Sequence, residues 1–353
     1  MDEPARMDDK AMPLVVTADE VLLDEALRLC AAVGVTPVVA RDTVAARKSW
    51  KVAPAVIVCA DLAPAVALTS PPRREGVVVV GHSVEGLWSD AVTLGAERVC
   101  AVPAEQDVVV EMLANAVEGH GEACVVSVMG GCGGAGATTV AAALVLAGAR
   151  RGLASLLLDA DPLGGGIDLV LGHEGVDGMR WRDLDRTHGR VSGESLRQVL
   201  PSRAGVDTLS WDRGEAIDVD PSSVQSVLAA ASRAYDLVAV DLPRRFEPVT
   251  EEVLARSVLT VLVVPEDIHA LSASGRVLEG LQRHTGNVVL LTRSRPRGIG
   301  PDVVGQTLGL PVLGRLRQER GLGARVDDGD GPGRSRTLRS GCGAVLDALG
   351  LAS

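Results

Sequence analysis

A glycine-rich segment between a buried strand and a helix is the feature that most constrains this 353-residue chain. The apolar run Val125–Met129 predicts a strand, the next seven residues a tight loop, and residues 137–151 a helix. From Gly131 to Thr138 the residues follow G-x-x-x-x-G-K-[ST], a pattern whose backbone N–H groups cradle phosphate. Ala137 stands where that pattern has its lysine. The sequence therefore predicts a phosphate cradle that lacks its cation.

The glycines give this loop its expected chemistry. Without a Cβ they let the chain turn tightly and direct consecutive N–H groups at one anion, and the positive end of the following helix points to the same place. No lysine follows Lys51, so a neighbouring lysine cannot supply the missing charge. The alternative is a flexible strand-to-helix turn without a ligand. The expected phosphate-binding residues are Gly131, Gly133, Gly134, Gly136, Thr138 and Thr139.

Two later strands end in carboxylates. One apolar run leads into Asp159 and Asp161, and a second leads into Asp241. In a parallel sheet such groups collect at the edge where ligands bind, and they can hold Mg²⁺ or orient a nucleophilic water. We expect Thr138, Asp159 and Asp241 to hold the metal, and Asp161 to be catalytic if the site is active. Any one of these aspartates could instead cap a helix or form a turn.

Taken together, these segments resemble the deviant P-loop proteins of the MinD/ParA family over about residues 122–350. Residues 132–139 read C-G-G-A-G-A-T-T, where the family has K-G-G-x-G-K-T-T. Asp159–Pro162 resembles the family's D-x-D-P segment, and Asp241–Pro243 resembles its Walker B and switch II. The resemblance implies ATP and Mg²⁺ as ligands, weakly bound here, and homodimer formation.

Two further segments, residues 161–168 and 179–184, are similar to the CpaE-like branch. This branch includes actinobacterial septum-site-determining proteins found beside type II/Tad pilus secretion genes. The resemblance implies a spatial regulator, with protein partners from the division machinery or from Tad pilus or secretion assembly. Trp181 within the second segment is expected to be either an anchor for such partners or a core residue.

The departures from the family fall on positions that contact the nucleotide. In the family, the lysine at the place of Ala137 contacts the β- and γ-phosphates, and the one at the place of Cys132 reaches the partner's phosphates in a dimer. The base pocket is expected at Pro265 and at Thr292, where the family has asparagine. Losing a cation near a triphosphate costs about 4 kcal/mol at ~4 Å and an effective dielectric of ~20. We therefore expect weak or absent ATP hydrolysis.

Arginine offers a replacement for the missing cation. Arg293, Arg295 and Arg297 follow a predicted strand, and Arg244 and Arg245 follow the second carboxylate strand. Arginine binds phosphate in a bidentate manner, so the alternative function is a slow but working ATPase that uses arginine. If these arginines only belong to solvated loops, that alternative fails.

Composition sets wider bounds. The net charge of −11 and the six aromatic residues argue against nucleic-acid binding. Six cysteines without a C-x-x-C pair indicate a reduced, cytoplasmic protein. Cys132 lies at a helix N-terminus, where thiol pKa values tend to fall, so it has either a redox role or an inert one. Without a signal or a long apolar run we expect no direct membrane insertion, and recruitment to a pole or septum through protein contacts.

The first 118 residues predict a separate domain of flavodoxin type, because short apolar strands alternate with helices. This part resembles a response-regulator receiver, with Asp61 near the phosphoacceptor position. Only Asp19 of the acidic pair is clear, Val102 replaces the lysine, and His82 replaces the hydroxyl residue. We expect a pseudo-receiver used for protein contacts. The alternative is a phosphorylation-gated signalling protein that acts through Asp61.

The expected fold is α/β in both parts. The predicted layout is a pseudo-receiver domain at residues 1–118, a polar linker at 119–123, and a MinD/ParA-like P-loop domain at 124–353. The last helix, expected at residues 343–351, lacks the basic face of a membrane-binding helix. We expect it to dock on its own sheet.

Overall fold

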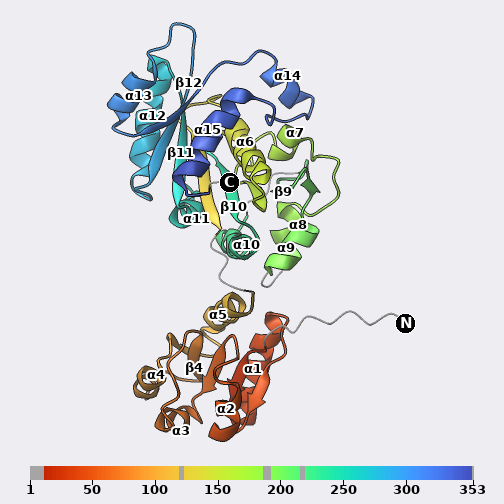
Figure 1. Cartoon of the computed structure of the whole chain (residues 1–353), viewed down its shortest axis with the longest axis vertical. Coiled ribbons are helices and arrows are strands. Elements are labelled where there is room, and N and C mark those ends of the chain that lie inside the picture. The colour runs from red at the N-terminus through yellow and green to blue at the C-terminus, as the bar shows by residue number, and fades with distance from the viewer. Residues whose placement is uncertain (1–11, 119–122, 186–191, 215–218, 352–353) are drawn as a thin grey trace, which may run out of the picture. The chain divides into compact units, whose positions relative to one another are not determined.

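The structure, a computed structural model, describes residues 12–118, 123–185, 192–214 and 219–351. The chain divides into two compact units, residues 1–120 and 121–353, each of which is an α/β unit (Figure 1). Most of the expected linker at residues 119–123 lies outside the described residues.

The first unit is built on a five-stranded parallel sheet in the order β2-β1-β3-β4-β5. Its strands are short, mostly apolar segments rich in valine, as expected for a sheet whose two faces are both covered by helices. The elements are β1 Leu14–Val16, α1 Glu20–Ala32, β2 Val38–Ala40, α2 Thr43–Ser49, β3 Val56–Cys59, α3 Ala63–Leu68, β4 Val77–Gly81, α4 Trp88–Leu94, β5 Arg98–Ala101 and α5 Gln106–Glu118. The strand order is that of the expected flavodoxin type.

The second unit is built on an eight-stranded sheet in the order β13-β12-β11-β6-β10-β7-β9-β8, parallel except for the pair β8 and β9. Its first half contains β6 Cys124–Gly130, α6 Ala137–Arg150, β7 Ser155–Asp159, α7 Ile167–Leu171, α8 Trp181–Asp185, α9 Gly193–Val199, β8 Ser202–Arg203, β9 Val206–Leu209 and α10 Pro221–Ala234. Its second half contains β10 Leu237–Leu242, α11 Pro248–Arg256, β11 Leu259–Pro265, α12 Ile268–Leu281, β12 Val288–Arg293, α13 Pro301–Leu308, β13 Val312–Leu316, α14 Leu322–Asp327 and α15 Arg336–Ala348.

Helices cover both faces of this sheet. On one face α6 and α15 pack side by side in one apolar cluster (Figure 1). On the other face α9, α10, α11 and α12 share a second apolar cluster with the sheet. Because β6, β10 and β11 are buried between the two clusters, the carboxyl ends of these strands are held in fixed positions at one edge.

The last helix docks on the body of its own unit, as expected, but its predicted start at residue 343 is wrong. Helix α15 begins at Arg336, because Ser335 caps it and accepts a hydrogen bond from the backbone of Leu338 at 3.2 Å. Leu338 and Leu346 are buried against α6. The glycines early in this helix hid its first turns from the sequence pattern.

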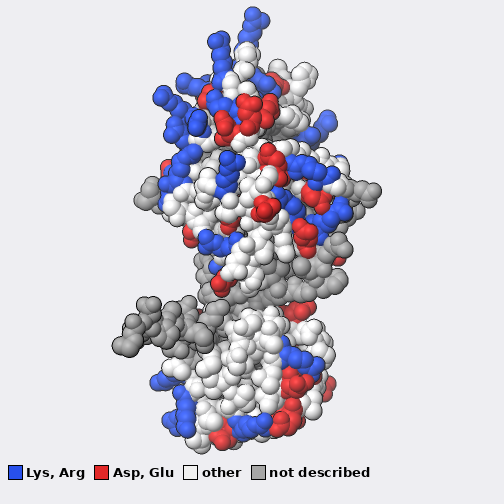
Figure 2. All heavy atoms as spheres, turned by 90° about the vertical axis from the view of Figure 1, so that its right-hand side faces the viewer, with Lys and Arg blue, Asp and Glu red and all other residues white. Residues whose placement is uncertain are grey.

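Among the described residues, no helix is both long enough and apolar enough to cross a bilayer. On the face shown in Figure 2, lysine and arginine side chains are interspersed with aspartate and glutamate. That face therefore carries charge of both signs over its described surface.

Candidate phosphate and metal site

The glycine loop joins β6 to α6 at the carboxyl edge of the larger sheet. Gly136, the residue before the helix, has a φ of 95°, which a residue with a Cβ rarely adopts. Gly131 lies so close to α12 that an added Cβ would be 2.0 Å from the Oγ atom of Ser274. The loop is thus a fixed turn held against a helix, and its glycines are required by backbone angle and by close packing.

Two buried carboxylates lie behind this loop. Asp159 ends β7, Asp241 lies in β10, and the two residues are partners in the register of these parallel strands. Asp159 is 1% exposed and Asp241 5% exposed. The hydroxyl of Thr138, in the first turn of α6, interacts with the Asp241 carboxylate and partly opposes the rise in its pKa. The structure therefore brings together the three residues expected to hold a metal.

Burial dominates the electrostatics of these carboxylates. It raises the pKa of Asp159 to about 7 and that of Asp241 to about 8, and the repulsion among the neighbouring acids adds to the increase. Hydrogen bonds that the Asp159 carboxylate accepts from the backbone N–H groups of Asp161 and Ile167 partly oppose the rise in its pKa. A divalent cation beside the pair would favour the ionised forms of both.

These residues fit Mg²⁺ of the type that accompanies a nucleotide. The described residues contain no group of three or more His, Cys, Asp or Glu that could hold an ion alone. Mg²⁺ at phosphate sites is usually bound through only one or two carboxylates and completes its shell with phosphate and water. The hydroxyl of Thr138 with Asp241 and Asp159 supplies such a partial set, so a metal here would depend on a bound phosphate.

Asp161 has a more accessible position than the two buried acids. Its Oδ1 atom accepts a hydrogen bond from the backbone of Leu163 at 3.1 Å, so the carboxylate shapes the turn after β7. The residue is half-buried, whereas Asp159 and Asp241 are buried. This position allows it to contact water at the site, and the same geometry satisfies a turn-forming role.

A buried acid that the sequence analysis left without a role follows in the same segment. Asp168 is 1% exposed and pairs with Arg213, whose Nη1 lies 3.0 Å from Oδ2. The hydroxyl of Ser210 also donates to Asp168 at 3.3 Å, and it lies 3.5 Å from the Asp159 carboxylate. This network fixes the segment after β7 against β9. In the sequence, only the spacing of Asp159, Asp161 and Asp168 could have indicated this network.

Arginines surround the loop where its lysine is absent. The Nη1 atom of Arg293, at the end of β12, donates to the carbonyl oxygen of Gly134 at 3.0 Å and to that of Ala135 at 3.4 Å. Burial lowers the pKa of Arg293, and the nearby charge of Arg295 lowers it further. Arg244 also approaches the loop, because its Nη2 lies 3.5 Å from the position that a Cβ on Gly133 would take.

The thiol of Cys132 lies within reach of the same charges. Burial raises its pKa, Asp267 raises it further, and the nearby arginines oppose the rise. The expected fall of the thiol pKa at this helix N-terminus is therefore not found, because desolvation exceeds the attraction of the positive groups. This environment favours an inert thiol.

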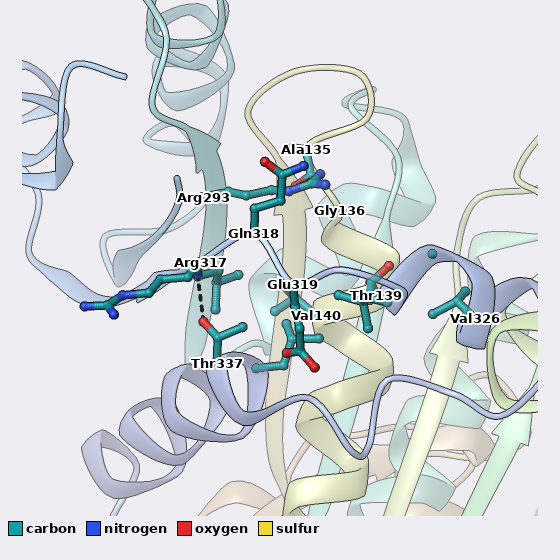
Figure 3. A pocket seen from close by; sticks show the side chains of 14 residues that line it. Ala135, Gly136, Thr139, Val140, Arg293, Arg317, Gln318, Glu319, Val326 and Thr337 are labelled. Carbon is teal, nitrogen blue, oxygen red and sulfur yellow. Dashed lines mark hydrogen bonds between the residues drawn. The ribbon is translucent and has the colours of Figure 1, made fainter. Parts of the chain in front are cut away.

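A cavity of about 280 Å³ opens beside the loop (Figure 3). The side chains of Arg293 and Gln318 lie at its loop end, and Thr139 lines it from the first turn of α6 (Figure 3). Its other wall comes from the segment after β13, where the backbone N–H of Arg317 donates to Thr337 at 2.8 Å. A ligand with its phosphate on the loop could extend into this cavity.

The two residues expected in the base pocket do not line this cavity. Thr292 is fully buried in β12, and its hydroxyl oxygen has no hydrogen-bond partner in the structure. Pro265 is buried at the end of β11, beside Arg293 in the strand register. The next residue, Glu266, is also buried and forms a bidentate pair with Arg315 at 2.8 and 2.6 Å. From the paired strands β11 and β12, the side chain that lines the cavity is that of Arg293.

The expected receiver site is assembled, but its acids are engaged by the protein itself. Asp61 accepts hydrogen bonds from the hydroxyl of Thr17 at 2.9 Å and from the backbone of Ala18 at 2.7 Å and Asp19 at 3.1 Å. Asp19 caps α1, and backbone N–H groups at the start of that helix lower its pKa. The two carboxylates thus hold the loop between β1 and α1 in place.

Trp181 is a core residue. Its side chain is 1% exposed, its Nε1 donates to the carbonyl oxygen of Asp159 at 2.6 Å, and its ring lies 5.8 Å from that of Trp211. Of the two alternatives expected for this position, the core residue is confirmed, because the ring packs inside the unit and supports the end of β7.

Solved structures share the fold of the second unit. A ParA family ATPase from Chlorobium tepidum matches with a TM-score of 0.58 and 17% identity, over 66% of this chain and all of that one. The septum site-determining protein MinD of Pyrococcus horikoshii, complexed with Mg-ADP, matches with a TM-score of 0.54 and 20% identity, over 64% of this chain and 97% of that one. The MinC:MinD cell division complex of Aquifex aeolicus matches with a TM-score of 0.52 and 19% identity, over 64% and 96%.

Fold and site together define an α/β protein in which a CheY-like unit precedes a P-loop unit of the MinD/ParA fold. Residues 16–123 match the family described as Rv3660c-like, CheY-like N-terminal domain. Protein Rv3660c of Mycobacterium tuberculosis is 34% identical over 340 residues, which are 94% of this chain and 96% of that protein. The chain belongs to the Rv3660c-like family.

Proposed function

We propose that this protein is a spatial regulator of the CpaE/MinD type, with weak or absent ATP hydrolysis. It acts in septum placement or in assembly of a Tad-type pilus or secretion machine. Its first unit serves as a pseudo-receiver for protein contacts. Its second unit offers dimer and partner surfaces that depend on a weakly bound nucleotide.

The observation that carries this proposal is a formed cradle without its catalytic cation. It is supported by the pairing of Asp159 with Asp241 in the strand register and by the position of Thr138 beside Asp241, while Ala137 stands at the lysine position. Backbone N–H groups and Mg²⁺ can still bind a phosphate, but they do not replace a cation at the transition state. Such a site is suited to sensing a nucleotide more than to hydrolysing it.

The shared fold supports the class of function. The Pyrococcus structure is that of a septum site-determining protein with Mg-ADP, and the Aquifex structure is that of a MinC:MinD cell division complex. For this chain we propose the same kinds of ligand and partner: ATP with Mg²⁺, a second copy of the chain, and proteins of the division or pilus machinery. Recruitment of a cytoplasmic protein to a pole or septum would follow from those contacts.

A second candidate function is a slow ATPase in which arginine replaces lysine. The guanidinium of Arg293 lies against the carbonyl oxygens of Gly134 and Ala135, and Arg244 approaches the loop near Gly133. An anion on the loop would attract both groups, and Asp161 would orient water. In this candidate the charge of Arg293 must move from the carbonyl oxygens to the phosphate.

A third candidate, phosphorylation-gated signalling through Asp61, has less support. Both oxygens of the Asp61 carboxylate accept hydrogen bonds from the loop that follows β1. Asp19, which would have to share a metal with it, is used as a helix cap.

The test of the proposed function combines ATP turnover with localisation of the full chain. The purified protein should hydrolyse ATP at background level with Mg²⁺, while the fluorescently tagged protein gathers at a pole or septum. Turnover like that of lysine-bearing relatives, lost in Asp161→Ala, would favour the slow ATPase instead. A uniform distribution in the cell would refute the role in positioning.

A further inference from the structure

A second basic feature lies in the first unit, at the opposite edge of its sheet from Asp61. An open cavity of about 580 Å³ is bounded by α2, the segment before β3, and the end of α3 with the turn after it. Asp61 follows the carboxyl end of β3, whereas this cavity lies where the chain enters β3 and β4. The cavity is therefore independent of the receiver-like site.

The lining of this cavity is cationic. Arg47, Lys48 and Lys51 line it, and no carboxylate does. Within the part of the chain that the structure describes, none of the three forms an ion pair, whereas Arg28 and Arg41 of the same unit pair with Asp24 and Glu20. Three uncompensated cations around one hollow contrast with the chain's net charge of −11. An anion is the ligand that such a hollow attracts.

Lysine is rare in this chain, yet it is concentrated at this cavity. The chain has only three lysines, Lys10, Lys48 and Lys51, and arginine serves at every other cationic position. Two of the three lysines line this one cavity. An ammonium group is a compact point charge that suits phosphate.

The remaining lining defines the rest of the ligand. Trp50, Val52 and Val66 provide an apolar wall. The Trp50 ring is held in place because its Nε1 donates to the carbonyl oxygen of Pro72 at 3.0 Å. Val52 is 75% exposed, so this wall continues to the mouth of the cavity. Hydroxyl groups on the lining, which can donate to an oxyanion, come from Thr43, Thr69 and Ser70.

We propose that this cavity binds a small, soluble organic anion that carries at least two phosphate groups. One phosphate group contributes a charge of about −1.5 to −2 near neutral pH, so two are needed to balance three cations. The volume lies within the range of about 300–1,000 Å³ that is typical of small-molecule sites, and it exceeds what inorganic phosphate fills. The apolar wall would contact the organic part of the ligand.

The three lysines allow a local test on the full-length protein. An amine-acetylating reagent is applied with and without inorganic pyrophosphate, and mass spectrometry measures the rate at each lysine. We expect pyrophosphate to slow modification of Lys48 and Lys51 several-fold, with Lys10 as the internal reference for reagent activity. If the modification rate of each lysine is the same with and without pyrophosphate, the proposal is overturned. The readout is local, so binding of pyrophosphate to the glycine loop does not affect its interpretation.

A paired variant gives the second measurement. Lys48→Gln combined with Lys51→Gln should weaken pyrophosphate binding at this site by at least about tenfold, because two charged hydrogen-bond donors are lost. Arg98→Gln, an exposed change on β5 of the same unit, should leave binding unchanged. Identical titrations of the paired variant and the unaltered chain would refute the site.

A final comparison distinguishes a soluble ligand from a lipid headgroup. Phosphatidylcholine vesicles containing cardiolipin, which carries two phosphates, are substituted for pyrophosphate in the labelling experiment. We expect pyrophosphate to protect the lysines and the vesicles to leave them reactive. Protection by vesicles alone would overturn the proposal of a soluble ligand.

Discussion

The guanidinium of Arg293 donates a hydrogen bond to the carbonyl oxygen of Gly134, 3.0 Å away, and so ties the end of β12 to the phosphate loop. The loop thereby contacts a cation from a distant strand, whose Nη1 atom lies 3.5 Å from the position that a Cβ on Gly136 would take. The charge is directed at backbone oxygens, where it stabilises the loop. The same charge lies close enough to respond to a phosphate that binds there.

Replacing Arg293 shows whether its charge mainly stabilises the loop or mainly binds the nucleotide. In Arg293→Gln we expect ATP binding in the presence of Mg²⁺ to weaken by about tenfold, because a charged hydrogen-bond donor beside the loop is lost. Arg297→Gln, in the exposed segment that follows the same strand, is the matched control and should bind ATP as the unaltered chain does. An unchanged affinity in Arg293→Gln would show that this arginine serves the loop and not the ligand.

Restoring the missing lysine should strengthen nucleotide binding. Ala137 opens α6 directly after the loop, and it is only partly buried, so a longer side chain has room to reach a phosphate. We expect Ala137→Lys to raise ATP affinity at least tenfold, within the limit of about 4 kcal/mol for a cation at ~4 Å. Isothermal titration measures the change. The absence of any gain would mean that this loop does not hold phosphate as P-loops do.

The buried carboxylates should make stability fall as pH rises. Asp241 has an ordinary pKa of 3.8 that burial raises to about 8. Between these values the folded protein retains a proton that the unfolded chain has lost, so the free energy of unfolding decreases with increasing pH. In Asp241→Asn we expect this slope to be reduced and stability at pH 8 to rise by several kcal/mol, because each pKa unit of the shift is worth about 1.4 kcal/mol.

The measurement is urea unfolding at several pH values, with Asp302→Asn as the exposed control. Asp302 lies on the surface in the first turn of α13, so its replacement should not alter the slope. If Mg²⁺ with ATP stabilises the chain more at pH 8 than at pH 6, the metal competes with protons at the buried pair. An increase of stability with pH in the unaltered chain would contradict this assignment.

Asp61 should behave as a structural residue. Small phosphodonors with Mg²⁺ should not label it, because both of its carboxylate oxygens already accept hydrogen bonds. We expect Asp61→Ala to lower the free energy of unfolding by about 1–3 kcal/mol, the cost of leaving hydrogen-bond donors such as the buried Thr17 hydroxyl without their acceptor. Stable labelling that disappears in Asp61→Asn would restore the phosphorylation-gated function.

The first unit should direct localisation. Removal of residues 1–118 should disperse the fluorescently tagged protein, while the P-loop unit remains folded, because that unit contains its own two apolar clusters. Circular dichroism of the shortened chain serves as the control for folding. Unchanged localisation after the deletion would assign the contacts to the second unit.

The sequence predicted most of the fold because the signals were local. Valine-rich runs indicated the strands of the first unit, and the glycines between β6 and α6 indicated the loop. A start for the last helix was mispredicted because its first turns contain Gly341 and Gly343, and the cap at Ser335 was overlooked.

The candidate site was predictable in part for the same reason. Thr138, Asp159 and Asp241 could be placed together because the carboxyl ends of parallel strands share an edge. Thr292 was expected in the base pocket from a motif position, but β12 is buried from Val288 to Thr292, and Arg293, at the end of the strand, lines the cavity instead.

The sequence by itself determined that a phosphate cradle exists and that it lacks lysine, since both follow from the order of residues in one short segment. Only the tertiary structure decided that Arg293 contacts the cradle, that Asp61 is engaged by its own protein, and that Trp181 is buried. The reason is physical: turns and strands depend on neighbours along the chain, whereas these contacts join residues far apart in sequence. Their geometry is set by how helices and strands pack, which residue spacing does not specify.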